Sequence, residues 1–182
     1  ELAAERGLAV DEEGFQRALA GQRERARAAE RFALEDAAAR QTYAAVLKSL
    51  QERGALPEGR VISKPYECTS LESVVLTIFS QGQPVGSARV GDAVEVITAQ
   101  TPFYAEAGGQ VSDTGWLTEL EDGRWQVEIE EVVKPLEGLL IHRGRVAKGT
   151  LQEGEGVSLQ VDEEWRWGIA RNHTATHLLQ AS

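Results

Sequence analysis

From about residue 61 to residue 161, short runs of the chain carry apolar side chains at every second position, the period of a β-strand with one buried face. The clearest run is residues 125–130, Trp-Gln-Val-Glu-Ile-Glu, which is apolar and polar at alternate positions throughout. Further strand-like runs lie at 71–79, 93–98, 110–117, 139–146 and 157–161, with glycines at turn positions between them. Such short, regularly spaced strands are typical of a small antiparallel barrel or sandwich. We predict a closed or nearly closed barrel in which Val127 and Ile129 point inward.

The residues on either side of this region have a helical period instead. Apolar positions within 43–50 recur at i, i+3, i+4 and i+7, and Gly54 followed by Pro57 is typical of a helix end. Asp162 is placed to cap a second helix. We therefore predict an α+β chain in three parts: a helical arm at 1–56, a β-barrel at 57–161, and at 162–182 the first helix of a further subdomain.

Composition narrows the classes of function. The chain has 19 Lys and Arg against 29 Asp and Glu, a net charge of −10, and such an acidic surface opposes general nucleic-acid binding. It does not exclude RNA contact within a larger protein. No apolar run approaches the roughly 18 residues of a membrane span, so no membrane partner is expected. The single cysteine, Cys68, cannot form an internal disulfide, which indicates a reducing, cytoplasmic location. Because the chain has no methionine, we expect an internal piece of a longer protein.

His173-Thr-Ala-Thr-His177 is the sharpest candidate for metal binding. Two histidines four residues apart on a helix project from one face and can chelate one zinc ion. The pair lacks the intervening glutamate of the metalloprotease His-Glu-x-x-His motif, so it supplies no general base of that kind. On these residues alone, metal binding and chance adjacency remain alternatives.

The stretch Thr101–Gly115 reads Thr-Pro-Phe-Tyr-Ala-Glu-Ala-Gly-Gly-Gln-Val-Ser-Asp-Thr-Gly. Gly108 and Gly109 permit backbone angles that other residues avoid, so they can bring Gln110 close to a ligand. The Gln110 amide can orient a water molecule or bind a hydroxyl group, because it both donates and accepts hydrogen bonds. A glycine-rich hairpin connection is the simpler explanation on physical grounds.

Together these stretches resemble alanyl-tRNA synthetases, in the region from the end of the tRNA-recognition helices into the editing domain. Thr101–Gly115 is similar to the family's Thr-Pro-Phe-Tyr-x-Glu-Ser-Gly-Gly-Gln-x-x-Asp-x-Gly signature, with Ala107 where serine is commoner. Residues 171–179 resemble the family's Asn-His-x-Ala-Thr-His-Leu-Leu signature. Residues 5–15 resemble the helix at the end of the family's preceding domain. The resemblance therefore covers essentially the whole chain.

The resemblance implies an editing site that hydrolyses tRNA(Ala) mischarged with serine or glycine, since a pocket for alanine rejects these amino acids only weakly. It implies substrate recognition by the motif that contains Thr101, Gly108, Gly109 and Gln110, and assigns no catalytic residue. It implies zinc held by His173 and His177 with a downstream Cys-x-x-x-His pair, which Cys68 does not match. ATP would serve only the aminoacylation domain of the parent ligase, and the expected partner is the tRNA(Ala) acceptor end.

Other functions remain open at this point. The chain can be a non-catalytic module that positions tRNA or packs between domains, or a stand-alone trans-editing hydrolase. The helical first 55 residues favour the synthetase. A peptide-release factor also uses Gly-Gly-Gln, but the acidic surroundings and the His-x-x-x-His pair disfavour it. His142 is expected to be a strand residue and no ligand, and Trp165 and Trp167 are expected to pack.

We expect the 182-residue chain by itself neither to retain zinc nor to hydrolyse mischarged tRNA, because two histidines supply half of a four-ligand site. Metal analysis after dialysis, with a seryl-tRNA deacylation assay against the parent ligase, tests this expectation. Stoichiometric zinc, or deacylation near the parental rate, would contradict it.

Overall fold

The computed structural model describes residues 37–106 and 111–168 of the chain. The chain divides into two compact units, Glu1–Gln41 and Thr42–Ser182, and every strand described below belongs to the second unit. Within the described ranges, no helix is both long enough and apolar enough to cross a membrane. The domain boundaries at residues 56 and 161 stay predictions.

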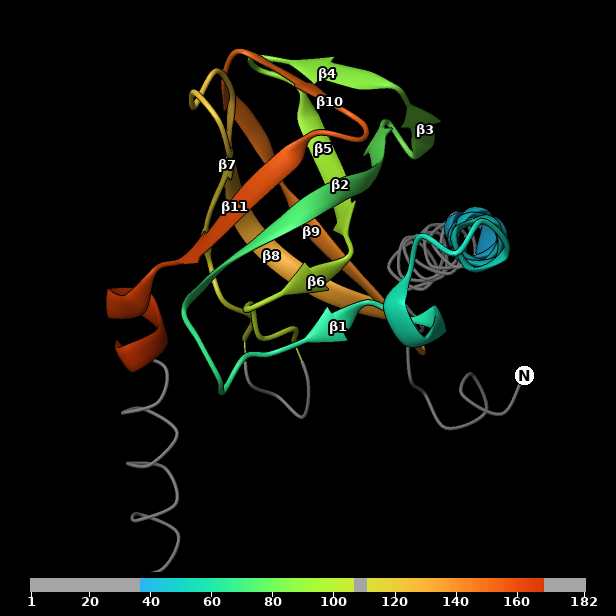
Figure 1. Cartoon of the computed structure of the whole chain (residues 1–182), viewed down its shortest axis with the longest axis horizontal. Coiled ribbons are helices and arrows are strands. Elements are labelled where there is room, and N and C mark those ends of the chain that lie inside the picture. Colours follow the sequence, from blue (N-terminus) through green and yellow to red (C-terminus); the bar gives the residue numbers. More distant parts are fainter. Residues whose placement is uncertain (1–36, 107–110, 169–182) are drawn as a thin grey trace, which may run out of the picture. The chain divides into compact units, whose positions relative to one another are not determined.

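Strands dominate the second unit (Figure 1). The longer ones are β2 (Ser70–Ser80), β5 (Ala93–Thr98), β7 (Gly115–Glu119), β8 (Gln126–Leu136), β9 (Leu139–Lys148) and β11 (Gly156–Val161). The short ones are β1 (Ile62–Ser63), β3 (Gln83–Val85), β4 (Ser87–Arg89), β6 (Gln100–Thr101) and β10 (Thr150–Gln152). A 3-10 helix, η2 (Pro57–Gly59), precedes β1, and residues 37–52 and 163–168 are helical.

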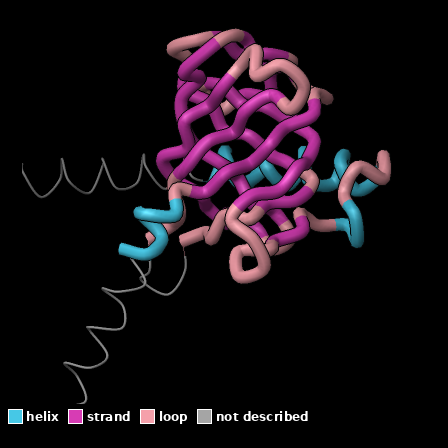
Figure 2. Tube along the Cα trace, turned by 60° about the vertical axis from the view of Figure 1, so that its left-hand side comes forward, coloured by secondary structure: helices cyan, strands magenta, loops and turns pink. Residues whose placement is uncertain are grey.

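The main sheet has the strand order β11-β7-β8-β9-β5-β2-β3 and closes on itself because β11 also pairs with β2. All pairings around this ring are antiparallel. Figure 2 shows the strands crossing obliquely around the barrel. The pair β1–β6 lies at one end and the pair β4–β10 at the other (Figure 1). The predicted antiparallel barrel is confirmed.

The inward-facing residues of the ring form the core. Val127 and Ile129 are 0% and 1% exposed, so the prediction from the alternating run is confirmed. They belong to one cluster of buried side chains from every strand of the ring, which includes Val75, Val96, Leu117, Val146 and Leu159. A one-residue slip of β8 would turn these side chains toward solvent, and this burial fixes the register.

Helical residues 42–52, which belong to the second unit, pack against one outer face of the barrel. Tyr43 and Leu50 are buried, and the Tyr43 ring meets Phe79 of β2 edge-on with 5.4 Å between centroids. The Tyr43 hydroxyl donates to Glu95 Oε2 at 2.6 Å, and Arg143 Nε donates to Glu95 Oε1 at 2.8 Å. The continuous apolar run of β2 is therefore buried on both faces.

This helix ends where the sequence predicted. Gly54 has φ of +66°, a left-handed conformation that glycine adopts without steric cost. Its N–H donates to the Gln51 carbonyl at 3.1 Å, and the Ala55 N–H donates to the Leu50 carbonyl at 3.0 Å. These two bonds form a Schellman motif, which satisfies the last free carbonyls of the helix.

The strand predicted at 110–117 is wrong for residues 111–114, which are not in a strand, and β7 begins at Gly115. Here side chains replace the backbone ladder: Ser112 Oγ accepts from the Val132 N–H at 3.0 Å, and Asp113 Oδ2 accepts from the Tyr104 N–H at 2.7 Å. Serine and aspartate compete with regular backbone pairing in this way. The alternating sequence pattern does not reveal that competition.

We expect Gly144→Ala to lower the free energy of unfolding by about 3 kcal/mol. An added Cβ at Gly144 would lie 1.9 Å from the Glu128 carbonyl oxygen of β8, so the two strands must separate. Gly86→Ala is the matched control, because no atom lies within 4 Å of its added Cβ, and we expect it to change stability by less than about 1 kcal/mol. Urea denaturation of the two variants measures both values, and equal effects would contradict the prediction.

Candidate functional site

The Thr101–Gly115 motif leaves the barrel at the end where β1 and β6 pair in parallel. Residues 102–106 extend away from β6, and residues 111–114 return to β7. We call these two segments the stems of the Gly-Gly-Gln loop. Gly108, Gly109 and Gln110, which lie between them in the sequence, are outside the described ranges, so their assignment to substrate recognition stays a prediction.

Hydrogen bonds join the two stems to each other. The Asp113 N–H donates to the Tyr104 carbonyl at 3.1 Å, and the Asp113 carboxylate accepts from the Tyr104 N–H at 2.7 Å. Each stem also contacts β8, because the Glu106 N–H donates to the Val132 carbonyl at 3.0 Å and the Val132 N–H donates to Ser112 Oγ. The base of the loop is thereby fixed on the rim of the barrel.

Arg166, in the helical segment 163–168, connects this base to that segment and to Pro65 after β1. Its Nε lies 3.2 Å from each carboxylate oxygen of Asp113, and its Nη2 also donates to Asp113 Oδ2. Its Nη2 donates to the Pro102 carbonyl at 2.7 Å, and its Nη1 donates to the Pro65 carbonyl at 2.9 Å. A planar guanidinium with five donors can bind this carboxylate and two carbonyls at once, whereas the ammonium group of a lysine lacks that planar arrangement of donors.

Arg166 lies in the helical segment 163–168, which follows β11. Asp162 caps this segment as predicted, since its Oδ1 accepts from the Trp165 N–H at 3.0 Å. The Asp162 N–H donates to the Thr114 carbonyl at 2.8 Å, and Glu163 accepts from the Thr69 hydroxyl at 2.6 Å. The start of the segment is therefore attached to the stem at residues 111–114 and to Thr69, which directly precedes β2.

Thr101 and His142 support the motif from inside the barrel. Both side chains are fully buried, and Thr101 Oγ1 lies 2.7 Å from His142 Nε2. His142 Nδ1 lies 3.0 Å from the Val96 carbonyl, which can only accept, so Nδ1 carries the proton and Nε2 accepts from Thr101. Thr101 Oγ1 in turn accepts from the Phe103 N–H at 3.1 Å. The hydroxyl thus fixes the start of the motif, and its predicted part in substrate recognition stays a prediction.

His142 is a satisfied strand residue, as expected from its position in the alternating run. Burial lowers the pKa of His142 to about 4, although its bond to the Val96 carbonyl acts in the opposite direction. The imidazole is therefore neutral at physiological pH.

A pocket of about 400 Å³ adjoins one stem of the loop. Its wall includes Tyr104, Ala105 and Glu106. The rest of its lining comes from η2, β1 and the β8–β9 turn: Glu58, Arg60, Val61, Ile62, Ser63, Pro65, Lys134, Glu137, Gly138, Leu139 and Leu140. The lining combines apolar and charged side chains, and its two cations are paired, Arg60 with Glu58 at 2.9 Å and Lys134 with Glu137 at 2.6 Å. The volume is within the range of small-ligand pockets.

The predicted metal ligands His173 and His177 lie outside the described residues. Within 37–106 and 111–168, no three His, Cys, Asp or Glu residues gather closely enough to hold a metal ion. The zinc assignment thus stays a prediction from the His-x-x-x-His spacing.

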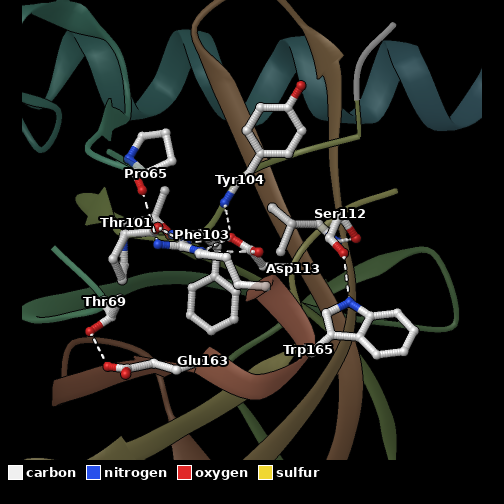
Figure 3. A network of polar contacts seen from close by, with 12 residues as sticks. Pro65, Thr69, Thr101, Phe103, Tyr104, Ser112, Asp113, Glu163 and Trp165 are labelled. Carbon is white, nitrogen blue, oxygen red and sulfur yellow. Dashed lines mark hydrogen bonds and ion pairs between the residues drawn. The ribbon is translucent and has the colours of Figure 1, made fainter. Parts of the chain in front are cut away.

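The sequence did not predict the role of Arg166. From the sequence we expect its neighbours Trp165 and Trp167 to pack. This expectation is wrong, because the two residues are 47% and 66% exposed. Trp165 Nε1 donates to the Ser112 carbonyl at 3.2 Å (Figure 3). No local pattern reports that an arginine between two tryptophans will meet a carboxylate 53 positions away.

Known proteins resemble the chain over nearly all of its length. The profile of the family "tRNA synthetases class II (A)" matches residues 1–165. The alanine–tRNA ligase of Acidothermus cellulolyticus is 43% identical over 98% of this chain and 19% of its own length. The corresponding ligases of Pelotomaculum thermopropionicum and Thermobifida fusca are 42% and 40% identical, over 98% and 100% of this chain and 19% of each relative. The chain thus spans about a fifth of the length of these relatives.

We expect the free energy of unfolding to fall as the pH falls from about 6.5 to 4. The pKa of His142 is about 4 in the folded chain and 6.5 in a model peptide, so the unfolded state binds more protons in this range. The full loss is about 3 kcal/mol. His142→Gln keeps a donor and an acceptor without titrating. Urea denaturation across this pH range should therefore show that the free energy of unfolding depends less on pH in the variant. An equal pH dependence in both proteins would contradict the assignment of the low pKa to His142.

Proposed function

The chain belongs to the tRNA synthetases class II (A), and from this membership we propose that it is part of an alanine–tRNA ligase. We propose further that it contributes one side of an editing site, where seryl- and glycyl-tRNA(Ala) are deacylated. The partner of this site is the acceptor end of tRNA(Ala). Relatives named as alanine–tRNA ligases, at 37–43% identity, support the proposal.

The observation that carries the proposal is the contact of Arg166 with the base of the Gly-Gly-Gln loop. Arg166 belongs to the segment that leads toward His173 and His177, and it binds Asp113 and the Pro102 carbonyl on the two stems of the loop. Arg166 thus contacts the stems of the first signature and lies five positions before the second signature, residues 171–179, begins in the sequence. A site that uses residues of both signatures is compatible with this contact.

The reaction is the attack of water on the ester between an amino acid and the tRNA ribose, which releases the amino acid and leaves the ribose hydroxyl. In the proposed site Gln110 binds the substrate's hydroxyl or orients the attacking water through its amide. Such a site is needed because an alanine pocket rejects glycine and serine by only a modest factor. The pocket beside Tyr104, Ala105 and Glu106 offers a concave surface next to the stem of the same loop.

We propose zinc as the cofactor, with His173 and His177 as two of its ligands. A bound zinc ion would polarise a carbonyl group or lower the pKa of a water molecule. ATP belongs to the aminoacylation reaction of the longer ligase. The net charge of −10 opposes non-specific attraction to the tRNA phosphates.

We expect Gln110→Ala, in the full-length ligase, to lower kcat for seryl-tRNA(Ala) deacylation about 100-fold, as loss of one positioned polar group does elsewhere. Alanine activation should be unchanged, because it occurs in another domain. Gln83→Ala is the matched control: Gln83 is an exposed residue of β3, and its loss should leave deacylation intact.

Deacylation that survives Gln110→Ala would remove Gln110 from the site and favour a module that only positions tRNA. A loss of alanine activation together with deacylation would point to misfolding instead of a defect in the editing site. The assay therefore separates the proposed function from both alternatives.

A further inference from the structure

We propose that the pocket beside β1 binds the terminal nucleoside of a single-stranded RNA end, and that its base stacks on the rings of Tyr66 and Tyr104. The inference rests on the proposed function, which supplies the acceptor end of a tRNA as the partner. All residues that form this nucleoside pocket lie within 58–66, 104–106 and 134–140, which the structure describes.

Two tyrosine rings stand together at one wall of the pocket. Tyr104 belongs to the lining, and the Tyr66 ring meets it edge to face, with 6.4 Å between the ring centroids and 60° between the ring planes. Tyr66 is 88% exposed, so burial of its ring contributes little to stability and its face is open to a ligand. Bases of single-stranded RNA stack on such rings, because every base has a flat π-face.

Hydrogen bonds fix the two segments that carry these rings. The Tyr104 N–H donates to the Asp113 carboxylate at 2.7 Å, and the Tyr104 carbonyl accepts from the Asp113 N–H at 3.1 Å (Figure 3). Arg166 donates to the carbonyls of Pro65 and Pro102, one residue before the first ring and two before the second. A surface that is fixed before the ligand arrives loses less conformational entropy on binding.

Aliphatic residues complete the pocket. Val61, Leu139 and Leu140 belong to its lining and are at most 7% exposed. The volume of about 400 Å³ is within the range of small-ligand pockets. A flat base that enters covers apolar surface with its faces, which is favourable in water, while its polar edge remains available to the charged residues of the lining.

The charges of the lining favour a neutral base over a phosphate group. Its two cations already have partners, Arg60 with Glu58 at 2.9 Å and Lys134 with Glu137 at 2.6 Å. The carboxylate of Glu106, which also lines the pocket, makes no hydrogen bond or ion pair with any described residue. A carboxylate accepts from the exocyclic amino group of adenine or cytosine, whereas uracil has a carbonyl oxygen at that place. The pocket therefore matches a base that carries an amino group.

The test is an NMR titration of the 182-residue chain with the ribotrinucleotides CCA and CCU, which differ only in the terminal base. We expect CCA to shift the backbone amide signals of Ile62 and Leu139 in the pocket. The signal of Ala88 in β4, whose pair with β10 lies at the other end of the barrel, should not move. CCU should bind about fivefold more weakly. The amide spectrum also reports whether each variant is folded.

Tyr66→Ala should raise the Kd for CCA about tenfold, because one stacking face is lost, whereas Tyr66→Phe keeps the ring and should bind like the parent chain. Trp116→Ala is the matched control: Trp116 is a 37% exposed aromatic residue of β7 outside the pocket lining, and its loss should leave Kd unchanged. Glu106→Ala should remove the preference for CCA over CCU. From about 50 to about 200 mM salt, Kd should rise less than about threefold, the change that one phosphate contact gives.

Three results would overturn the inference. They are the absence of shifts at the pocket amides at about 5 mM CCA, an unchanged Kd for Tyr66→Ala, and a steeper salt dependence, which would mean that phosphates drive binding. Each result leaves the proposed function to its own test, deacylation by Gln110→Ala in the full-length ligase. If deacylation survives that substitution while CCA binding still depends on Tyr66, the editing function fails and the nucleoside pocket stands.

Discussion

The hydrogen bonds between β2 and β11 close the sheet, and the site depends on that closure. Residues Ser70–Val74 of β2 pair with β11, and the second half of the strand pairs with β5 on its other edge. Closure brings the end of β11 beside the segment before β2, where the Val161 N–H donates to the Thr69 carbonyl at 2.9 Å. The helical segment that starts at residue 163 therefore lies next to residues 102 and 112–114, although these are far from it in sequence.

The buried polar side chains at this end of the barrel form hydrogen bonds. Every buried side-chain nitrogen or oxygen in the described part of the chain has a hydrogen-bond partner. Buried Asp113 is matched by Arg166, and buried His142 is matched by Thr101 and by the Val96 carbonyl. An unpartnered group of this kind would destabilise the fold by about 1–3 kcal/mol. The same hydrogen bonds also hold the stems of the loop, so they both stabilise the fold and position the stems.

Much of the barrel was predictable because its signal is local. The alternation in residues 125–130 and the helix stop at Gly54 each depend on a few consecutive residues, and both predictions are confirmed. The prediction was wrong for 111–114, where Ser112 and Asp113 use side chains in place of the strand ladder. It was also wrong for Trp165 and Trp167, because a large aromatic residue near a helix start has no fixed degree of burial. Both differences lie beside the candidate site.

The sequence by itself determined where most of the longer strands lie and, in residues 125–130, which face is buried, since both follow from the period of its apolar residues. It also indicated the family, through two long motifs. The tertiary structure alone decided that Arg166 binds Asp113, Pro102 and Pro65, residues as many as 101 positions away. The same is true of the proton on His142 Nδ1, which depends on a carbonyl 46 positions away. Such contacts form only when the sheet closes into a barrel and brings distant residues together. No local sequence pattern encodes them, because the geometry of the whole barrel determines which residues meet.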